Sequence, residues 1–396
     1  MVGASHTRHT TESVEGSGAA VRVLVMNWGS SSLKYVIIDP ETGDEALSGN
    51  IEEIGLGGVA DHGEALGLVT EHMDRELGSD HGVDAVGHRV VHGGEKFSEP
   101  ALVTPEVIEE IDALSPLAPL HNPAAASGLR AVSEQWPDLP QVVVFDTAFH
   151  RTMPEKAWRY AIPDVLYKEH GVRRYGFHGT SHEYVAGVAA ATLGIASAEF
   201  NGIVAHLGNG ASVTAIREGK SYDTSMGYTP LAGLVMGTRS GDLDPSVVTQ
   251  LIERGLYTAD ELDVMLNKRS GLLGLAGRSH MKEVVDAAAT SPEAQLALDV
   301  AAYRLQKYIG GYHVAIGGAQ CLVFTGGIGE NSAPFREIVC RGLTPLGIEL
   351  DEDANNNVAK EPTVISAEGS AITVMVVPTD EEVAIAKATA HLLSNL

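Results

Sequence analysis

The sequence predicts an α/β protein, and three observations support this prediction. Short runs rich in Val and Ile alternate with longer Ala- and Leu-rich segments of helical periodicity. The 396 residues suffice for two or three domains with sizeable cores. One strand–turn–strand pattern occurs twice, as VLVMNWGSSSLKYVIID at 23–39 and GIVAHLGNGASVTAIRE at 202–218. The repeat predicts a duplicated domain, although two hairpins with Gly turns can also be similar by chance.

The predicted strands are the apolar, β-branched runs of the chain. They cover 21–27, 33–39, 85–93, 141–147, 201–208, 212–218, 321–327 and 372–379. Helix starts are predicted from Asp244-Pro245 and Asn122-Pro123, where a cap residue precedes a proline. Two further starts have the spacing of a capping box, Thr180 to Glu183 and Thr379 to Glu382.

Charge and composition narrow the range of partners. The formal net charge of -25 argues against a nucleic-acid partner, which needs clustered Lys and Arg. No apolar run is long enough to cross a membrane, so no membrane partner is expected. Residues 1–20 lack the apolar core of a signal peptide and are predicted to be a disordered tail. With only two cysteines and no export signal, we expect a cytoplasmic protein.

Three Gly- and Ser-rich segments are candidate phosphate-binding turns. NWGSSSLK offers the hydroxyls of Ser30, Ser31 and Ser32 and the cation of Lys34, which suit phosphate oxygens. HLGNGAS at 206–212 and FTGGIGEN at 324–331 follow apolar strands, and FTGGIGEN is predicted to be a loop. An ordinary hairpin or turn explains each segment almost as well. No Walker loop is present.

Charged residues near predicted strand ends are candidates for ligand contacts. Arg89 lies within an apolar strand, Arg239 lies between glycines in a loop, and His178 directly precedes a helix. A structural salt bridge explains either arginine equally well, and a buried or capping role explains the histidine. Asp146 ends an apolar strand, where carboxylates often face a ligand, whereas the helix dipole alone explains Glu381. No cluster of His and Cys residues has the spacing of zinc ligands, so Mg²⁺ with oxygen ligands is the metal that remains.

In combination and in order, these segments resemble acetate kinases. The segments are NWGSSSLK, GHRVVHGGE, APLHNP, FDTAFH, YGFHGTSH, HLGNGAS, MGTRSGDLDP, FTGGIGEN and PTDEE. The resemblance implies duplicated actin-like ATPase domains of ribonuclease H-like fold around a central nucleotide cleft. It implies an N-terminal domain at 21–150, completed by a helix at 382–396, and a nucleotide-binding domain at 151–381. A homodimer that transfers the ATP γ-phosphate to acetate, giving acetyl phosphate and ADP, is also implied.

The resemblance further implies roles for individual residues. Mg²⁺, or Mn²⁺, is held by Asn27 and Glu381. The catalytic residues are Asp146, His178, Arg239, Arg89 and His121. Acetate is bound by Arg89, Val91, Leu120, Phe177 and Pro230. ATP is bound by Lys34, Ser30, Ser32, His206, Leu207, Gly208, Asn209, Gly210, His280, Met281, Lys282, Gly327, Ile328, Gly329, Glu330 and Asn331.

Asp146 is expected to orient an arginine or metal-bound water rather than to remove a proton. This is because acetate, the carboxylic acid substrate that the resemblance implies, is already ionised at neutral pH and has no proton to lose.

The segment Arg278-Ser-His-Met-Lys282 departs from the Ser-x-Asp-x-Arg stretch usual in the family, and Trp28 replaces a smaller residue. The first departure leaves the nucleotide preference open. A propionate or butyrate kinase remains an alternative, because one methylene is worth only about 1–3 kcal/mol in a pocket. An actin- or Hsp70-like nucleotide-dependent binding module is the alternative from another class.

Overall fold

The structure, a computed structural model, describes residues 21–79 and 81–396, and the predicted tail at 1–20 lies outside the described residues. The chain divides into two compact units. Unit 1 comprises Met1–Ala148 and Asp380–Leu396, and unit 2 comprises Phe149–Thr379. The functional domain boundaries given above stay predictions, and each unit is described by itself.

Unit 1 is built on a six-stranded sheet of order β3-β2-β1-β4-β6-β5. Strands β1, β2 and β3 form an antiparallel meander, β1, β4 and β6 run parallel, and β5 is antiparallel to β6. The strands are β1 Val23–Trp28, β2 Ser32–Ile38, β3 Glu45–Glu52, β4 Ala85–Val90, β5 Ala101–Leu102 and β6 Gln141–Phe145. The parallel strands therefore end at one edge, where Asn27, Arg89 and Asp146 lie.

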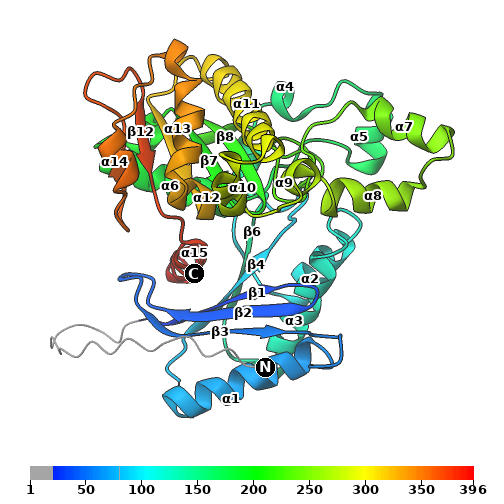
Figure 1. Ribbon diagram of the computed structural model, residues 1–396. Helices are drawn as coiled ribbons and strands as arrows, with labels where there is room; N and C mark the ends of the chain where they lie inside the picture. Colours follow the sequence, from blue (N-terminus) through cyan, green and yellow to red (C-terminus); the bar gives the residue numbers. More distant parts are fainter. Residues whose placement is uncertain (1–20, 80) are drawn as a thin grey trace. The chain divides into compact units, whose positions relative to one another are not determined.

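Helices cover both faces of this sheet. On one face, α3 (Asn122–Gln135) packs on β1 and β4, α1 (His62–Leu77) packs on β2 and β3, and α2 (Pro105–Ala113) packs on α3. The C-terminal helix α15 (Glu381–Ser394) covers the other face, against β1, β2, β4 and β6 (Figure 1). A Cβ at Gly87 would lie 2.6 Å from Thr389 Oγ1, so glycine in β4 allows α15 to approach closely.

Unit 2 repeats the strand arrangement of unit 1. Its sheet has the order β11-β12-β10-β7-β8-β9, with a β7–β8–β9 meander and parallel strands β7, β10 and β12. The strands are β7 Gly202–Leu207, β8 Ala211–Arg217, β9 Lys220–Thr224, β10 Cys321–Thr325, β11 Thr363–Val364 and β12 Thr373–Val376. The repeated hairpins of the sequence are thus β1–β2 and β7–β8, at the same place in two sheets of one topology.

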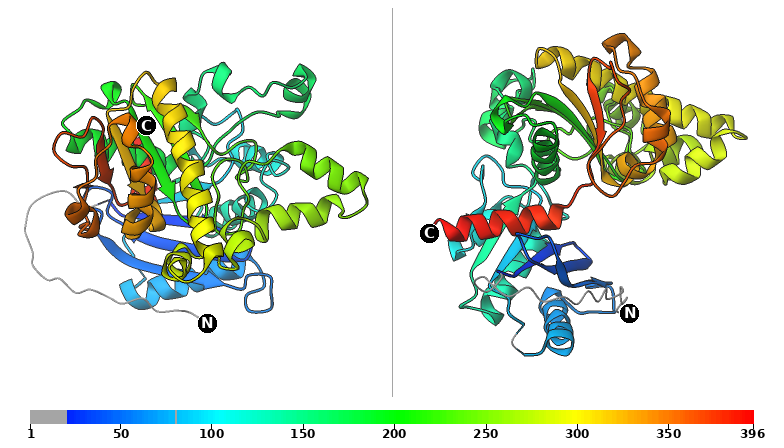
Figure 2. Two further views of the ribbon diagram at one scale, coloured as in Figure 1. Left: turned by 45° about the horizontal axis from the view of Figure 1, so that its top comes forward. Right: turned by 90° about the vertical axis from the view of Figure 1, so that its left-hand side faces the viewer.

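Two helices cover the faces of the unit 2 sheet. Helix α6 (Gly179–Thr192) buries Val185 and Ala189 against Val204 and Val323. The opposite face carries α11 (Pro292–Ala315), drawn in yellow along the green strands in Figure 2.

Shorter helices surround these two. Helices α9 (Gly271–Ala276), α10 (Met281–Ala288) and α13 (Ala333–Arg341) pack on α11, α12 (Gly326–Asn331) packs on β7 and β10, and α14 (Glu352–Asn356) packs on α13. Helices α7 (Pro245–Glu253) and α8 (Ala259–Lys268) form an arm that projects from the unit, and α4 (Glu155–Trp158) and α5 (Asp164–His170) are short. Three 3₁₀ turns lie at Phe149–Thr152, Ser197–Glu199 and Thr344–Leu346.

All eight predicted strands are confirmed, and the missed strands are short or polar, such as β3 and β9. Three helix starts were wrongly placed by one or two residues, because the carbonyls of His121 and His178 already accept helical N–H groups and the carboxylate of Asp380 accepts the N–H of Val383. The cap of α6 is His178 rather than Thr180, that of α3 is His121, and that of α15 is Asp380. FTGGIGEN is not a loop: its last six residues form helix α12 (Gly326–Asn331). Among the described residues no helix is long and apolar enough to cross a membrane.

Candidate active site

An ion cluster lies at the strand ends of unit 1. Arg89, near the end of β4, donates from Nε to Asp146 Oδ1 at 2.9 Å and from Nη2 to Asp146 Oδ2 at 2.7 Å. Glu381, the first residue of α15, lies 3.5 Å from Arg89 Nε. The bidentate pair fixes the guanidinium plane. Arg89 Nη1 has no hydrogen-bond partner among the described residues, so this end can bind an external anion.

The carboxylates of this cluster outnumber its one guanidinium. The cluster therefore favours binding of a further cation, alone or together with an anionic ligand. Burial alone would lower the pKa of Arg89, but Asp146 and Glu381 outweigh it, so the pKa lies above its ordinary value. Burial also raises the pKa of Glu381, Asp146 and Glu382 raise it further, and Arg89 opposes them. One guanidinium thus balances several carboxylates.

Asn27 and Lys34 lie beside the cluster on neighbouring strands. Asn27 on β1 is in register with Arg89 on β4 and with Lys34 on β2. Lys34 is exposed, Ser30 lies in the β1–β2 turn and Ser32 begins β2, and Gly29 donates its N–H to the carbonyl of Ser32 at 2.7 Å. The structure therefore brings together the metal and phosphate residues predicted for unit 1.

The segment after β4 is fixed by a side chain that the sequence did not single out. Asn122 donates to the carbonyl of His92 at 2.9 Å and to that of Ile111 at 3.2 Å. This anchors the buried segment that follows Val91 to the start of α3, which His121 caps.

The four predicted acetate-pocket residues divide between the units. Val91 is half-buried and Leu120 exposed in unit 1, while in unit 2 Phe177 is buried and Pro230 half-buried. Their role as one pocket stays a prediction.

A histidine cluster occupies the corresponding edge of unit 2. The rings of His178 and His206 stack with centroids 4.4 Å apart. Ser212 Oγ lies 2.9 Å from His178 Nδ1 and 2.7 Å from His182 Nε2. Ser181 Oγ bonds His206 Nδ1 at 2.8 Å. Because His182 is fully buried, its pKa lies well below the ordinary value and the ring is neutral.

Arg239 approaches the same edge from the loop after β9. Its Nη1 donates to the carbonyl of Pro230 at 3.1 Å, and it has no carboxylate within 4.0 Å among the described residues. A Cβ at Gly210 would lie 3.5 Å from Arg239 Nη1 and 3.4 Å from His178 Nε2. A half-buried cation without an acidic partner is arranged to receive an anion.

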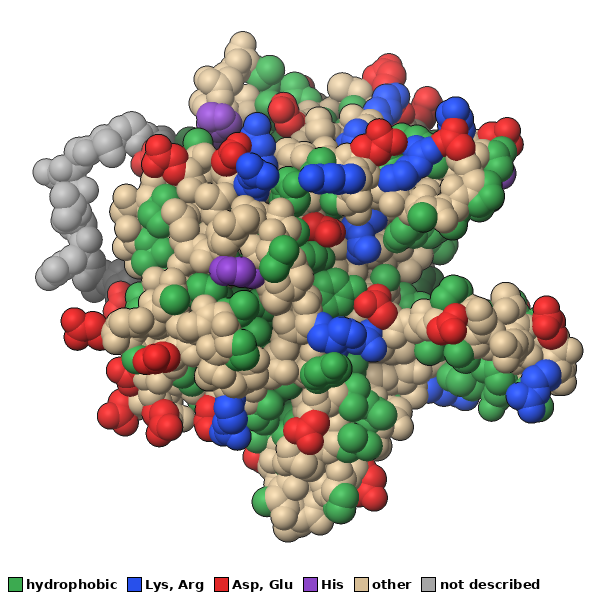
Figure 3. Space-filling view, turned by 90° about the horizontal axis from the view of Figure 1, so that it is seen from above, with side chains coloured by type: hydrophobic (Ala, Val, Ile, Leu, Met, Phe, Trp, Pro, Cys, Tyr) green, Lys and Arg blue, Asp and Glu red, His purple; other side chains and the backbone are tan. Residues whose placement is uncertain are grey.

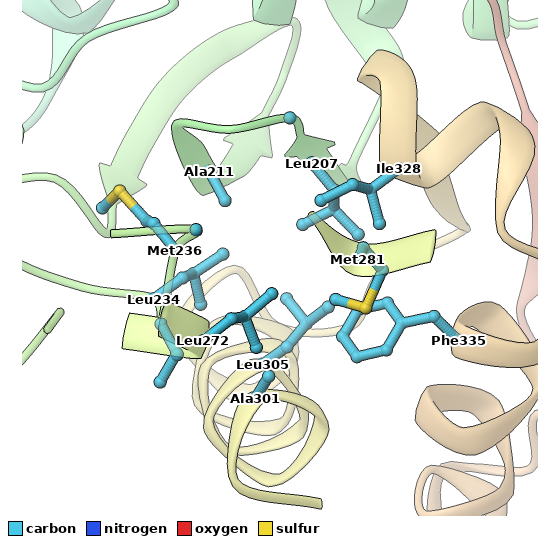
Figure 4. Close-up of a pocket in the computed structure, with 13 residues that line it drawn as sticks. Leu207, Ala211, Leu234, Met236, Leu272, Met281, Ala301, Leu305, Ile328 and Phe335 are labelled. Carbon is cyan, nitrogen blue, oxygen red and sulfur yellow. The ribbon is translucent and has the colours of Figure 1, made fainter. Parts of the chain in front are cut away.

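An apolar pocket adjoins this edge (Figure 4). It encloses about 340 Å³ up to its open mouth. Its walls come from the β7–β8 hairpin, the loop that carries Arg239, and helices α9 to α13. The lining residues are Leu207, Gly208, Ala211, Leu234, Val235, Met236, Gly237, Leu272, Met281, Ala301, Leu305, Ile328 and Phe335. Without a charged side chain in its walls, the pocket suits a flat apolar ring system.

Comparison with known proteins decides the family. Residues 55–387 match the sequence profile of the Acetokinase family. The chain is 60% identical to the acetate kinase of Micrococcus luteus, over 93% of this chain and 99% of that protein. It is 59% identical to the acetate kinase of an Arthrobacter species, over 94% and 99%.

The chain belongs to the acetokinase family.

Solved structures of an acetate kinase and a propionate kinase agree with the fold. The Porphyromonas gingivalis acetate kinase superposes with a TM-score of 0.91 at 44% identity and covers 94% of this chain and 100% of its own. A Francisella tularensis propionate kinase superposes with a TM-score of 0.88 at 42% identity, over 94% and 99%. The predicted α/β fold with duplicated actin-like ATPase domains is confirmed.

Other predicted ATP contacts are only partly gathered at the pocket. Leu207, Gly208, Met281 and Ile328 line it. In the segment that departs from the acetokinase pattern, Met281 points inward, whereas His280 and Lys282 are exposed.

Two residues predicted to bind ATP already have structural partners. Glu330 Oε1 accepts the N–H groups of Gly326 and Thr379, and Asn331 donates to the carbonyl of Gly327. The other predicted members of these loops are Asn209, Gly210, Gly327 and Gly329, of which Gly329 is buried. Direct contact of Glu330 and Asn331 with a nucleotide stays a prediction.

Sequence reasoning missed several buried polar residues of this acetokinase. In unit 1, Trp28 Nε1 donates to His88 Nδ1 at 3.1 Å, and His88 Nε2 lies 3.1 Å from Gln141 Oε1. In unit 2, Ser212 and His182 contact His178. The available sequence signal for these residues was a polar side chain within an otherwise apolar run.

Proposed function

We propose that this chain is an acetate kinase that transfers the ATP γ-phosphate reversibly to acetate, giving acetyl phosphate and ADP. The observation that carries the proposal is 60% identity over nearly the full length with a relative named acetate kinase. Both units also carry groups that suit this chemistry. Phosphoryl transfer depends mainly on positioning and on charge stabilisation, which arginines and a divalent cation supply.

The side chains at the strand ends of unit 1 suit the acceptor carboxylate and the metal. Arg89 Nη1 would bind the acceptor carboxylate while Asp146 holds the rest of the guanidinium. Asp146 is engaged in this bidentate pair, and acetate is already ionised at neutral pH. Orientation of Arg89 is therefore the role we propose for Asp146, with no proton removed from the acceptor.

Mg²⁺, or Mn²⁺, fits the oxygen donors of unit 1. No three His, Cys, Asp or Glu side chains form a ready-made metal cluster in the part of the chain that the structure describes. Mg²⁺ usually binds one or two carboxylates together with substrate phosphates and water. Glu381 and the amide of Asn27 provide oxygen donors of this kind. When bound, the ion neutralises charge on phosphate oxygens.

The groups of unit 2 suit the nucleotide. Arg239 and His178 lie near Gly210, where a phosphoryl group can approach the backbone closely. The adjoining apolar pocket would accept the adenine ring, with Leu207, Met281 and Ile328 in van der Waals contact.

A carboxylate-dependence assay tests the proposal. Hydroxylamine traps the acyl phosphate, and the assay compares acetate, propionate and butyrate with ATP and Mg²⁺. We expect the highest kcat/KM with acetate and lower values with longer chains. ATP turnover that no carboxylate changes would contradict the proposal and favour an actin- or Hsp70-like binding module.

A propionate kinase is the second candidate, because a propionate kinase structure superposes with a TM-score of 0.88. Preference for propionate by more than about tenfold in the same assay would establish it, since one methylene is worth about 1–3 kcal/mol.

We also propose that the enzyme is a homodimer. Helix α7 buries none of its residues within the chain, and Val247 and Ile252 are about 40% exposed. On α11, Leu296, Tyr303 and Val314 are exposed as well, and Figure 3 shows apolar side chains among the charged ones. A second copy of the chain would cover this apolar surface. Light scattering after size-exclusion chromatography tests the oligomeric state.

The cytoplasmic location stays a prediction.

A further inference from the structure

We propose that His182 and Ser212 form a one-directional hydrogen-bond relay that holds the His178 ring with its proton on Nε2. The relay makes the Nε2–H of His178 a donor, and His182 and Ser212 are positioning residues. The relay itself follows from the geometry of unit 2, and only its kinetic consequence rests on the proposed function.

The relay begins at His182, whose surroundings select one tautomer. The side chain is fully buried and neutral. Its Nε2 lies 2.7 Å from Ser212 Oγ, while its Nδ1 has no hydrogen-bond partner among the described residues. Nδ1 is unpaired in either tautomer, but an orphaned buried N–H is rarer in proteins than an orphaned buried acceptor, and only the Nε2–H tautomer leaves no N–H unpaired. The proton therefore lies on Nε2, and His182 donates to Ser212.

The bond from His182 sets the direction of the next hydrogen bond, between Ser212 and His178. The Ser212 hydroxyl has one proton, and it already accepts a hydrogen bond from His182. The second neighbour of the oxygen is His178 Nδ1, at 2.9 Å. Ser212 Oγ has no other hydrogen-bond partner among the described residues, so its proton is donated to His178. Because Ser212 is fully buried, its hydroxyl has this positioning role and is not accessible as a nucleophile.

His178 is the end of the relay. Its Nδ1 accepts from Ser212, so in the neutral ring the proton lies on Nε2. The ring stacks on His206, and its backbone has a φ of 58°, in the left-handed region that non-glycine residues rarely adopt. Such strain persists only where neighbouring contacts enforce it.

The direction of the relay matters because of what lies near Nε2. His178 Nε2 and Arg239 Nη1 are both within 3.5 Å of the position that a Cβ would occupy at Gly210. A phosphoryl oxygen near this point would meet two donors. The other tautomer would present a nitrogen lone pair to the same oxygen and repel it.

The tautomer can be measured directly on the full-length protein. Histidine labelled with ¹⁵N distinguishes protonated from unprotonated ring nitrogens, and His178→Gln identifies the His178 signals. We expect a protonated Nε2 and an unprotonated Nδ1 without any substrate. A protonated Nδ1 in the wild type would overturn the relay. Neither result bears on the carboxylate-dependence assay, so the two proposals fail separately.

Variants test the link from relay to rate. Ser212→Ala should mix the His178 tautomers and lower kcat about 10²-fold, the size of losing one oriented donor, with a much smaller change in KM. His182→Gln keeps an N–H near the position of Nε2 and should retain the wild-type tautomer. Thr214→Val is the matched control, because it removes a buried hydroxyl bond to Thr224 on the same face of β8. If Ser212→Ala matched Thr214→Val in tautomer and kcat, the relay would be rejected.

Discussion

The two sheets place different chemistry at corresponding positions of one topology. Asn27 of unit 1 and His206 of unit 2 are the next-to-last residues of β1 and β7, which occupy corresponding central positions in their sheets. Their cross-strand neighbours are Lys34 and Arg89 in unit 1, and Ser212 and Thr325 in unit 2. Unit 1 therefore gathers an arginine, a lysine and carboxylates that balance each other, whereas unit 2 gathers histidines, among them the neutral His182, and an arginine without an acidic partner among the described residues. A duplicated backbone constrains where functional side chains lie and leaves their charge free to differ.

The largest expected contrast is between Arg89 and Arg239. Both Arg89→Leu and Arg239→Leu should lower kcat/KM by about 10³-fold or more, since each removes charge stabilisation of the transferred group. Only Arg89→Leu should also lower the free energy of unfolding, by about 3–5 kcal/mol, because Asp146 and Glu381 lose their partner. Urea unfolding with the hydroxamate assay measures both effects. Equal losses of stability in the two variants would show that the two arginines do not differ in their structural role.

Acid should destabilise unit 1 through its buried histidines. Burial lowers the pKa of His88 to about 3 and that of His92 to about 4. The unfolded chain binds protons below about pH 6.5, and the folded unit does not, so stability falls as the pH drops below that value. Between pH 6.5 and 5 each histidine should cost up to about 2 kcal/mol.

Urea unfolding at pH 7.5 and 5 measures this loss. His88→Gln should reduce it, while His391→Gln, on the exposed side of α15, should leave it unchanged. A loss that His88→Gln leaves intact would assign the acid sensitivity to other groups, including the buried His182 of unit 2.

Trp28 should be worth about 2 kcal/mol of stability. It corresponds in register to Leu207 of unit 2, and Trp28→Leu removes the donor to His88 and leaves a cavity beside Gly128. Gly128→Ala alone should also destabilise, because its Cβ would lie 2.2 Å from the Trp28 ring. The double variant should be less destabilised than the sum of the two. Strict additivity in urea unfolding would show that the two side chains do not compete for space.

The smallest effect is expected at Ser31. Its carbonyl accepts the N–H of Ile54, and that backbone contact survives Ser31→Ala. We expect kcat/KM within about twofold of the wild type, whereas Ser30→Ala and Ser32→Ala should each raise the KM for ATP several-fold, as expected for lost phosphate hydrogen bonds. Equal effects at all three serines would show that Ser31 also contacts the phosphate.

Much of the fold was predictable because its signals are local. The hairpins at 23–39 and 202–218 follow from β-branched runs around short polar turns, and all eight predicted strands form. Helix starts and α12 were less predictable. FTGGIGEN contains too much glycine for a helix by propensity, and α12 forms where Glu330 binds the N–H of Gly326 and Arg336 binds the carbonyl of Gly329.

The sequence by itself determined the alternating strands and helices, the repeated hairpin and the residue types that suit phosphoryl transfer. Only the tertiary structure decided their partners, because those contacts join residues far apart in the chain. Arg89 meets Asp146 across 57 positions, and Ser212 meets His178 across 34. Periodicity describes a residue's own strand or helix, whereas the pairing of strands in a sheet decides which side chains share a charge or a proton.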